Sequence, residues 1–318
     1  MVAPAPPRPT PPRRAWAFYA LLAVILLALP AGYFLFLARS EALPPPPPQR
    51  VEALESEPEK KMEVRIAGME GSVEVRHLDG TWGPAQIGDA LIGTNAVRTL
   101  DGAEAVLACG DAWQVRMEAG TEVSVDELTE SISRILLANG MATATVRGGA
   151  KHAFEVRSAG SDAVARTSAG AFAISNNGEG TVAVGTREGE VELSGNGKVV
   201  IVRSGQQSIV HSGQAPTEPT AVPSSLLLKV KWPEKALLTR RKLVVAGQTQ
   251  PGAHVVVAGH VVRASGDGRF SQTLQLSEGR NQIDVRAVTV GGGRATSDAD
   301  LQVDTRNPTI GIDRDLWK

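Results

Sequence analysis

Short apolar runs separated by glycine-containing turns fill most of the chain between residues 64 and 303. Up to residue 211, valine, isoleucine, leucine and alanine alternate with polar residues, as at Val73 and Val75. This period of two is typical of strands with one buried face. The continuous run Val199–Val202 favours a strand that is buried on both faces. We therefore predict an all-β domain for residues 64–211.

Turn signals lie between these runs. Asp-Gly and Asn-Gly dipeptides tolerate a positive φ and favour tight hairpins. The chain has them at 79–80, 101–102, 139–140, 177–178 and 196–197.

One segment of this domain fits two structures. In Asp126–Ala138, apolar residues recur at helical spacing, and Asn139-Gly140 would end such a helix. The Ile132–Leu137 portion also fits a strand, and the surrounding β pattern favours that alternative.

A second β domain is predicted beyond a proline-rich boundary. Residues 212–225 contain Pro216, Pro219 and Pro223 among Gly, Thr and Ser, which is typical of a linker. About seven short strand candidates follow in residues 226–305, as in a small β-sandwich. Residues 306–318 form a mostly polar tail.

The N-terminal part of the chain differs from the β domains in composition. Residues 15–38 are uncharged and mostly apolar, and a helix of that length spans about 36 Å, enough to cross a bilayer core. Arg8, Arg13 and Arg14 precede it, which favours a cytoplasmic N-terminus and an exterior, periplasmic location for the bulk of the chain. A cleaved secretory signal is the alternative, because Ser40-Glu41-Ala42 resembles a cleavage site.

The predicted membrane helix is flanked by proline-rich segments. Residues 1–14 are predicted to form a short disordered tail. Residues 39–63 contain the run Pro44–Pro48, which favours a stiff polyproline II rod, and continue with a Glu-rich spacer.

Composition adds few candidates for chemistry. The formal net charge is −1 and basic residues are not interleaved with aromatic ones, so we expect no nucleic-acid partner. Cys109 is the sole cysteine, so no intrachain disulfide can form. Its place in an alternating apolar run predicts a buried core residue.

Catalytic and metal-binding motifs are not found. The sequence has neither Gly-x-Ser-x-Gly nor His-Glu-x-x-His. His254 and His260 flank a predicted hairpin turn and could approach each other, although single surface histidines are the commoner case. Gly291–Gly293 is interpreted as a strand connection rather than a phosphate-binding loop. We predict no catalytic, cofactor-binding or metal-binding residue.

The first domain resembles the FecR domain family over roughly Gly71 to Gln207. The order and spacing of several short segments carry this resemblance: Gly71–Val75, Gly88-Asp89, Gly93–Thr99, Asp101–Leu107, Val115–Met117, Gly120–Val123, Ala163–Thr167, Phe172–Ile174, Gly189–Leu193 and Gly205–Gln207. The resemblance implies an extracytoplasmic domain of short strands stacked in a partly solenoid-like arrangement.

Well-known FecR relatives lie in the inner membrane and relay a signal from an outer-membrane transporter to a cytoplasmic sigma factor. That output requires an anti-sigma domain before the membrane helix. The proline-rich residues 1–14 are not expected to form one. We therefore expect this chain to share the FecR domain of these relatives but not their signalling mechanism.

The second domain is similar to bacterial immunoglobulin-like modules. The matching segments are Leu243–Thr249, Pro251–Val257, Asp267–Phe270, Leu274–Leu276 and Glu278–Ala287. Such modules commonly act as spacers or as adhesion and ligand-binding units.

These features together predict a non-enzymatic protein of the inner membrane. We expect its two periplasmic β domains to bind a protein or ligand of the cell envelope. A FecR-type regulator of transcription is one alternative, and a cell-wall-acting enzyme with an unrecognised site is another.

Overall fold

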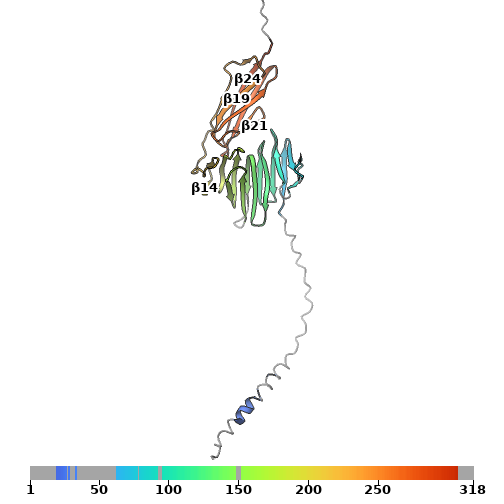
Figure 1. Ribbon diagram of the computed structural model, residues 1–318, viewed down its shortest axis with the longest axis vertical. Helices are drawn as coiled ribbons and strands as arrows, with labels where there is room; N and C mark the ends of the chain where they lie inside the picture. Colours follow the sequence, from blue (N-terminus) through green and yellow to red (C-terminus); the bar gives the residue numbers. More distant parts are fainter. Residues whose placement is uncertain are drawn as a thin grey trace, which may run out of the picture. The chain divides into compact units, whose positions relative to one another are not determined.

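The structure is a computed structural model that describes residues 19–26, 28, 33, 62–77, 79–91, 95–147 and 152–306. The chain divides into two compact units, Met1–Lys60 and Lys61–Lys318. Every regular element described in the second unit is a β-strand (Figure 1). The all-β expectation for this part of the chain is confirmed.

Residues 19–26, 28 and 33 of the first unit are helical. Among the residues that the structure describes, no helix has both the length and the apolar character needed to span a bilayer. The other residues of the predicted span 15–38 lie outside the described residues, as do 1–14, 39–61 and 307–318. The membrane helix, the proline rod and the two tails therefore stay predictions.

The described residues of the first β domain form sixteen strands. They are β1 Val64–Glu70, β2 Val73–Arg76, β3 Trp82–Pro84, β4 Ala90–Leu91, β5 Ala96–Thr99, β6 Glu104–Cys109, β7 Trp113–Met117, β8 Glu122–Leu128, β9 Ile132–Val146, β10 Ala153–Ser158, β11 Val164–Thr167, β12 Gly170–Asn176, β13 Val182–Gly195, β14 Lys198–Arg203, β15 Gln206–Val210 and β16 Thr220–Ala221.

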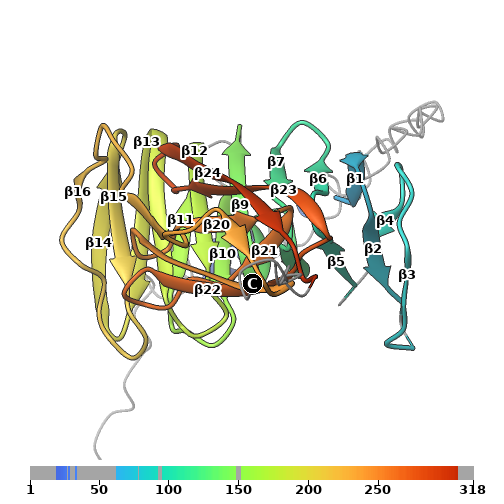
Figure 2. The same cartoon turned by 90° about the horizontal axis from the view of Figure 1, so that it is seen from above.

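These strands pair in two ladders that share β9 and β13. One ladder runs β4-β1-β6-β7-β9-β12-β13-β15-β16, and the other runs β3-β2-β5-β8-β9-β10-β11-β13-β14. Apart from the outermost strands β4 and β3, both follow the order of the sequence, so the strands succeed one another from β1–β5 at one end to β13–β16 at the other (Figure 2). The long strands β9 and β13 tie the two ladders together.

Strand β9 changes partners at Asn139-Gly140. Residues before this point pair with β8 and β10, and residues from Gly140 onward pair with β7 and β12. The strand interpretation of Ile132–Leu137 is thus confirmed. The hairpin expected at Asn139-Gly140 is wrong, because the positive φ of Gly140, 96°, bends a continuous strand from one ladder into the other.

Three of the other turn dipeptides join strands that pair with each other. They lie between β2 and β3, β12 and β13, and β13 and β14. Asn196 and Gly197 both have positive φ, 43° and 75°, as a type I′ turn requires. Asp101-Gly102 instead connects β5 to β6, which belong to different ladders.

The core of the first domain lies between the two ladders. Trp113, Phe154 and Phe172 are fully buried there. The ring centroids of Trp113 and Phe154 are 5.2 Å apart, and those of Phe154 and Phe172 are 6.3 Å apart. Cys109 is 3% exposed on β6, and burial raises the pKa of its thiol. Its assignment as a core residue is confirmed.

The run Val199–Val202 is not buried on both faces. Val199 is 60% exposed, whereas Val200 and Val202 are buried. Among the strands that the structure describes, β14 pairs only with β13 and is therefore an edge strand. The core covers one of its faces, and the prediction of two buried faces is wrong.

The second β domain has eight strands in two sheets. They are β17 Leu228–Lys231, β18 Leu237–Leu238, β19 Lys242–Thr249, β20 His254–Val257, β21 His260–Val262, β22 Arg269–Gln275, β23 Gly279–Val288 and β24 Arg294–Val303. One sheet has the order β17-β19-β22 and the other β18-β24-β23-β20-β21. Leu243, Val255, Phe270, Ile283 and Val303 are among the residues of their shared apolar core.

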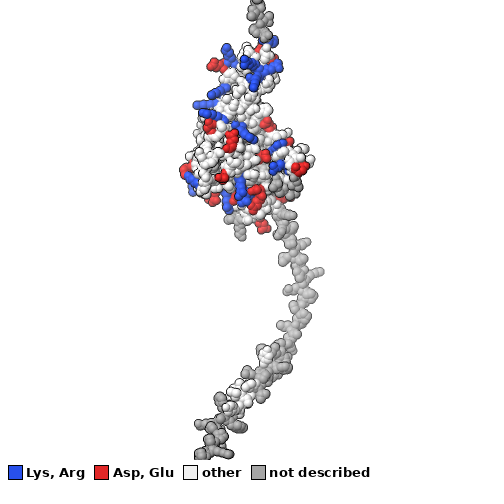
Figure 3. Space-filling view, in the orientation of Figure 1, with Lys and Arg blue, Asp and Glu red and all other residues white. Residues whose placement is uncertain are grey.

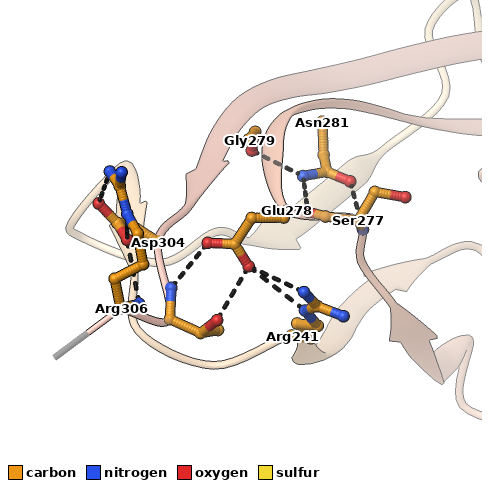
Figure 4. A network of polar contacts seen from close by, with 8 residues as sticks. Arg241, Ser277, Glu278, Gly279, Asn281, Asp304 and Arg306 are labelled. Carbon is orange, nitrogen blue, oxygen red and sulfur yellow. Dashed lines mark hydrogen bonds and ion pairs between the residues drawn. The ribbon is translucent and has the colours of Figure 1, made fainter.

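A polar network closes one end of this domain (Figure 4). Glu278 accepts hydrogen bonds from the backbone N–H and the hydroxyl of Thr305, at 2.9 Å each, and from Arg241. These bonds lower the pKa of Glu278, and the bond from the backbone N–H of Thr305 has the largest effect. Asn281 holds the same loop by bonds to Ser277 and Gly279. The end of β24 is therefore fastened to the turn before β23.

Candidate functional site: the junction of the two β domains

The two β domains meet over a small apolar cluster. Ala173 and Ala183 of the first domain and Val290 of the second are buried in it together with Met141. On β12 and at the start of β13, consecutive residues are buried, because the core covers one face and the second domain covers the other. The junction is thus a packed interface within one compact unit.

Small residues allow the backbones to approach closely here. A Cβ added at Gly185 would lie 2.6 Å from the carbonyl oxygen of Val290, and one at Gly252 would lie 2.5 Å from the Cβ of Ala183. Such distances are below any real van der Waals contact. Larger side chains at these positions would therefore separate the two domains.

Polar contacts surround the apolar cluster. Asp101 accepts a hydrogen bond from the backbone N–H of Val261 at 2.9 Å and lies 2.8 Å from Nδ1 of His260. Ser175 donates to the carbonyl of Gly252 at 2.6 Å. Asn177 donates to the carbonyl of Ala264 at 3.1 Å. These bonds fix the orientation of the second domain at several separated points.

A groove of about 600 Å³ opens beside these contacts. Residues of both domains line it: Ser72, Arg98–Asp101, Gly120–Glu122, Asn139, Gly140, Ser175–Asn177, Gly252–His254 and Val261–Ala264. The lining residues include acidic, basic and amide residues, a composition that suits a ligand or peptide held by several polar contacts.

The groove is rigid at the bend of β9. Thr121 is fully buried, and its hydroxyl bonds both the N–H and the carbonyl of Met141 at 3.0 Å. Its own N–H donates to Thr99 Oγ1 at 2.9 Å. Asn176 donates to the carbonyls of Leu137, Ala138 and Ala159. The backbone around Gly140 is therefore held from both sides.

His254 lies at the junction with an unsatisfied ring nitrogen. Its Nε2 is buried and has no hydrogen-bond partner among the described residues. Burial lowers the pKa of His254 to about 4. The charged residues that line the adjoining cavity with it are Glu104, Glu118, Arg286 and Arg294, and burial raises the pKa of Glu118.

Acidification is expected to weaken the folded unit through His254. Its pKa is about 4 when folded, against 6.5 for the ordinary side chain, so the stability it contributes is complete above pH 6.5 and is lost as the pH falls toward 4. The loss amounts to about 3 kcal/mol. Denaturant unfolding between pH 7.5 and pH 4 measures it, and a His254→Gln variant should lack this part of the pH dependence. Identical pH profiles for both proteins would contradict the assignment.

The structure brings the two candidate histidines into one hairpin, as expected. His254 is on β20 and His260 is on β21, but His260 bonds Asp101, whereas His254 lines the adjoining cavity and its Nε2 is buried. Among the residues that the structure describes, no group of three or more His, Cys, Asp or Glu side chains could hold a metal ion. Gly291–Gly293 connects β23 to β24, in agreement with the sequence interpretation.

Sequence reasoning missed the residues that form the junction. Asp101 and Asn177 were recognised only as turn residues, and Ser175 was not singled out. The available signal was the pair Ala173 and Ala183, which are small apolar residues at positions where an exposed sheet face would carry polar ones.

Glu155 on β10 lies in a row of ion pairs that crosses four strands. It is buried and accepts a hydrogen bond from Arg134 at 2.8 Å, with Arg166 at 3.6 Å. Arg134 also pairs with Glu127. This row of alternating charges crosses β8 to β11 and supports the parallel pairing of β9 with β10.

Comparison with known protein families bears on the first domain. Residues 95–192 match the FecR protein family model. These residues form a FecR family domain. They run from the start of β5 into β13 and include Asp101, Ser175 and Asn177 of the junction. The FecR resemblance is thus confirmed for this range, whereas the immunoglobulin-like resemblance of residues 226–305 stays a prediction.

Solved structures provide more distant likenesses. Two crystal structures of a candidate anti-sigma factor from Parabacteroides distasonis have 22% sequence identity and a TM-score of 0.36. Each match covers 40% of this chain and 59% of the length of the Parabacteroides distasonis chain. Fibronectin(III)-like modules of Clostridium thermocellum CbhA have 12% identity and a TM-score of 0.22, with 57% of this chain and 94% of theirs covered. A comparison with curated proteins found no match.

Proposed function

We propose that this chain is a non-enzymatic protein of the cell envelope that binds an envelope protein or ligand through its two β domains. In this proposal, residues 15–38 anchor it in the inner membrane and the β domains face the periplasm. The second domain acts as an immunoglobulin-like module that completes the binding surface of the FecR family domain.

The observation that carries the proposal is the groove at the junction. It is lined by residues of both domains, and its walls are held by Asp101, Ser175 and Asn177. A pre-formed hollow with several polar groups is the usual form of a binding site. The FecR family match supports an envelope or signalling role for the domain that forms one wall.

Site-specific photocrosslinking in cells tests this proposal. A crosslinking residue at Leu100, which lines the groove and is 38% exposed, is expected to capture one discrete product. The matched control is Val199, which is more exposed and lies on edge strand β14 outside the groove. A Ser72→Trp substitution, which fills the groove from its exposed rim, should remove the product. The same products at both positions, or a product that survives Ser72→Trp, would contradict the proposal.

A FecR-type regulator of transcription is the second candidate, and the family match favours it. In that case the Ser72→Trp variant would alter the transcription of target genes as well as abolish capture. If the Ser72→Trp variant lost the crosslinked product but target transcript levels were unchanged, the binding role would stand and a role in transcription would be excluded.

A further inference from the structure

The outward face of the three-stranded sheet carries cations and no carboxylate. Along β17, β19 and β22, inward residues are buried or half-buried and alternate with exposed ones. Lys229, Lys231, Lys242 and Arg269 are exposed on the outward side. The other outward residues of these strands are Val244, Ala246, Gln248, Ser271, Thr273 and Gln275. We call this surface the basic face.

The register spreads the charges over a plane. Lys229 is opposite Gln248, which is opposite Arg269, so one row crosses all three strands. Neighbouring strands are about 4.8 Å apart, which places the two cations of this row about 10 Å apart at their backbones. Lys231 follows Lys229 on the same strand at about 7 Å. The basic face therefore presents separated charges rather than one tight cluster.

The lysines of the basic face are not neutralised within the described part of the chain. Lys229, Lys231 and Lys242 form no ion pair with any described residue, and Arg269 pairs with Asp267 of the preceding turn. On the other sheet, by contrast, Arg280 pairs with Asp300 at 3.0 Å and Arg286 with Asp284 at 2.6 Å.

Other exposed basic and apolar side chains lie close to the basic face in the sequence. Arg240 is exposed just before β19. Lys235 and Arg241 are exposed in the same segment, but Arg241 pairs with Glu278 at 3.2 Å, and Leu237–Leu238 of this segment pair with β24 of the other sheet. Figure 3 shows exposed Lys and Arg side chains on this domain, with Asp and Glu among them. Leu227, which precedes β17, is 47% exposed, and Val244 on β19 is 53% exposed.

The composition of this surface favours a lipid bilayer over a protein partner. Protein interfaces are enriched in aromatic residues and Arg and depleted in Lys, whereas the outward residues of β17, β19 and β22 include three lysines and no aromatic side chain. Lysine is a flexible point charge that needs no fixed geometry of its partner. Clusters of four to eight basic residues with nearby apolar side chains suit anionic headgroups. We propose that the basic face binds a membrane surface rich in anionic lipid.

Vesicle co-sedimentation tests the proposal with residues 61–318, a compact unit that contains all three apolar clusters. The unit is expected to bind vesicles of phosphatidylcholine with about 30% phosphatidylglycerol at low salt, and to be released at about 0.5 M NaCl. Pure phosphatidylcholine vesicles should not bind it. The triple variant Lys229→Gln, Lys231→Gln, Lys242→Gln should bind about 100-fold more weakly, because each basic residue contributes about fivefold.

The matched control removes the same charge from the other sheet. The variant Arg280→Gln, Arg286→Gln, Arg294→Gln should bind nearly as well as the parent, and circular dichroism verifies that both variants fold. Failure to bind anionic vesicles, equal binding to neutral ones, or equal losses in both triple variants would overturn the proposal. Tighter binding to polyglutamate than to vesicles, lost only in the lysine variant, would overturn it in favour of an acidic protein chain.

Discussion

A Gly140→Ala substitution is expected to destabilise the first β domain by about 3–5 kcal/mol. Gly140 has a φ of 96° at the bend of β9, and an added Cβ would lie 2.5 Å from the Cα of Thr121. Thr121 cannot move aside without losing both of its hydrogen bonds to Met141. Denaturant unfolding at neutral pH measures the change in the free energy of unfolding.

Gly197→Ala is the control for backbone conformation alone. Gly197 also has a positive φ, 75°, but no atom lies within 4 Å of an added Cβ. Its substitution should cost about 1–2 kcal/mol. If the two variants were equally destabilised, close packing at the bend of β9 would not be the reason that glycine is required there.

Substitution of Ala183 by glutamate is expected to separate the two β domains. Ala183 is 1% exposed in the junction cluster with Val290, and a carboxylate there would be buried without a partner. The cost is about 3–5 kcal/mol, which exceeds what a cluster of this size can offset. Hydrogen exchange should show lost protection at β12, at the start of β13 and around Val290, and thermal unfolding should split into two transitions.

The same chemical change on an exposed strand provides the control. Val199→Glu places a carboxylate on β14, where the side chain is already 60% exposed. It should leave both the exchange pattern and the single transition unchanged. A single transition in Ala183→Glu as well would show that the junction cluster does not hold the two domains together.

The differences between prediction and structure have a common cause. Asn139-Gly140 has the local signal of a hairpin, and Gly140 does adopt a positive φ. A dipeptide determines its own backbone angles, but not whether the next residues fold back on the same strand. In β9, the following residues pair with β7 and β12 in the other ladder. The run at Val199 likewise indicates a strand, but not whether a second layer covers it.

The junction was hidden from the sequence for a similar reason. The prolines of residues 212–225 predict a linker between two domains, yet β16 at Thr220–Ala221 pairs with β15 and Val222 packs against Gly291. Ala173, Ala183 and Gly185 are common strand residues with no signature of an interface. Their meaning depends on Val290, which lies more than a hundred residues further along the chain.

The sequence by itself determined the all-β character, the hairpin turns at three of the five marked dipeptides and the burial of Cys109, because alternation and positive-φ residues act over a few neighbours. It also predicted a FecR family domain, through the order of short segments over roughly Gly71 to Gln207, of which residues 95–192 match the family model. Only the tertiary structure decided the bend of β9, the docking of the second domain and the buried environment of His254. These features arise from contacts between segments far apart in the chain, and no local pattern encodes which distant surface will cover a strand.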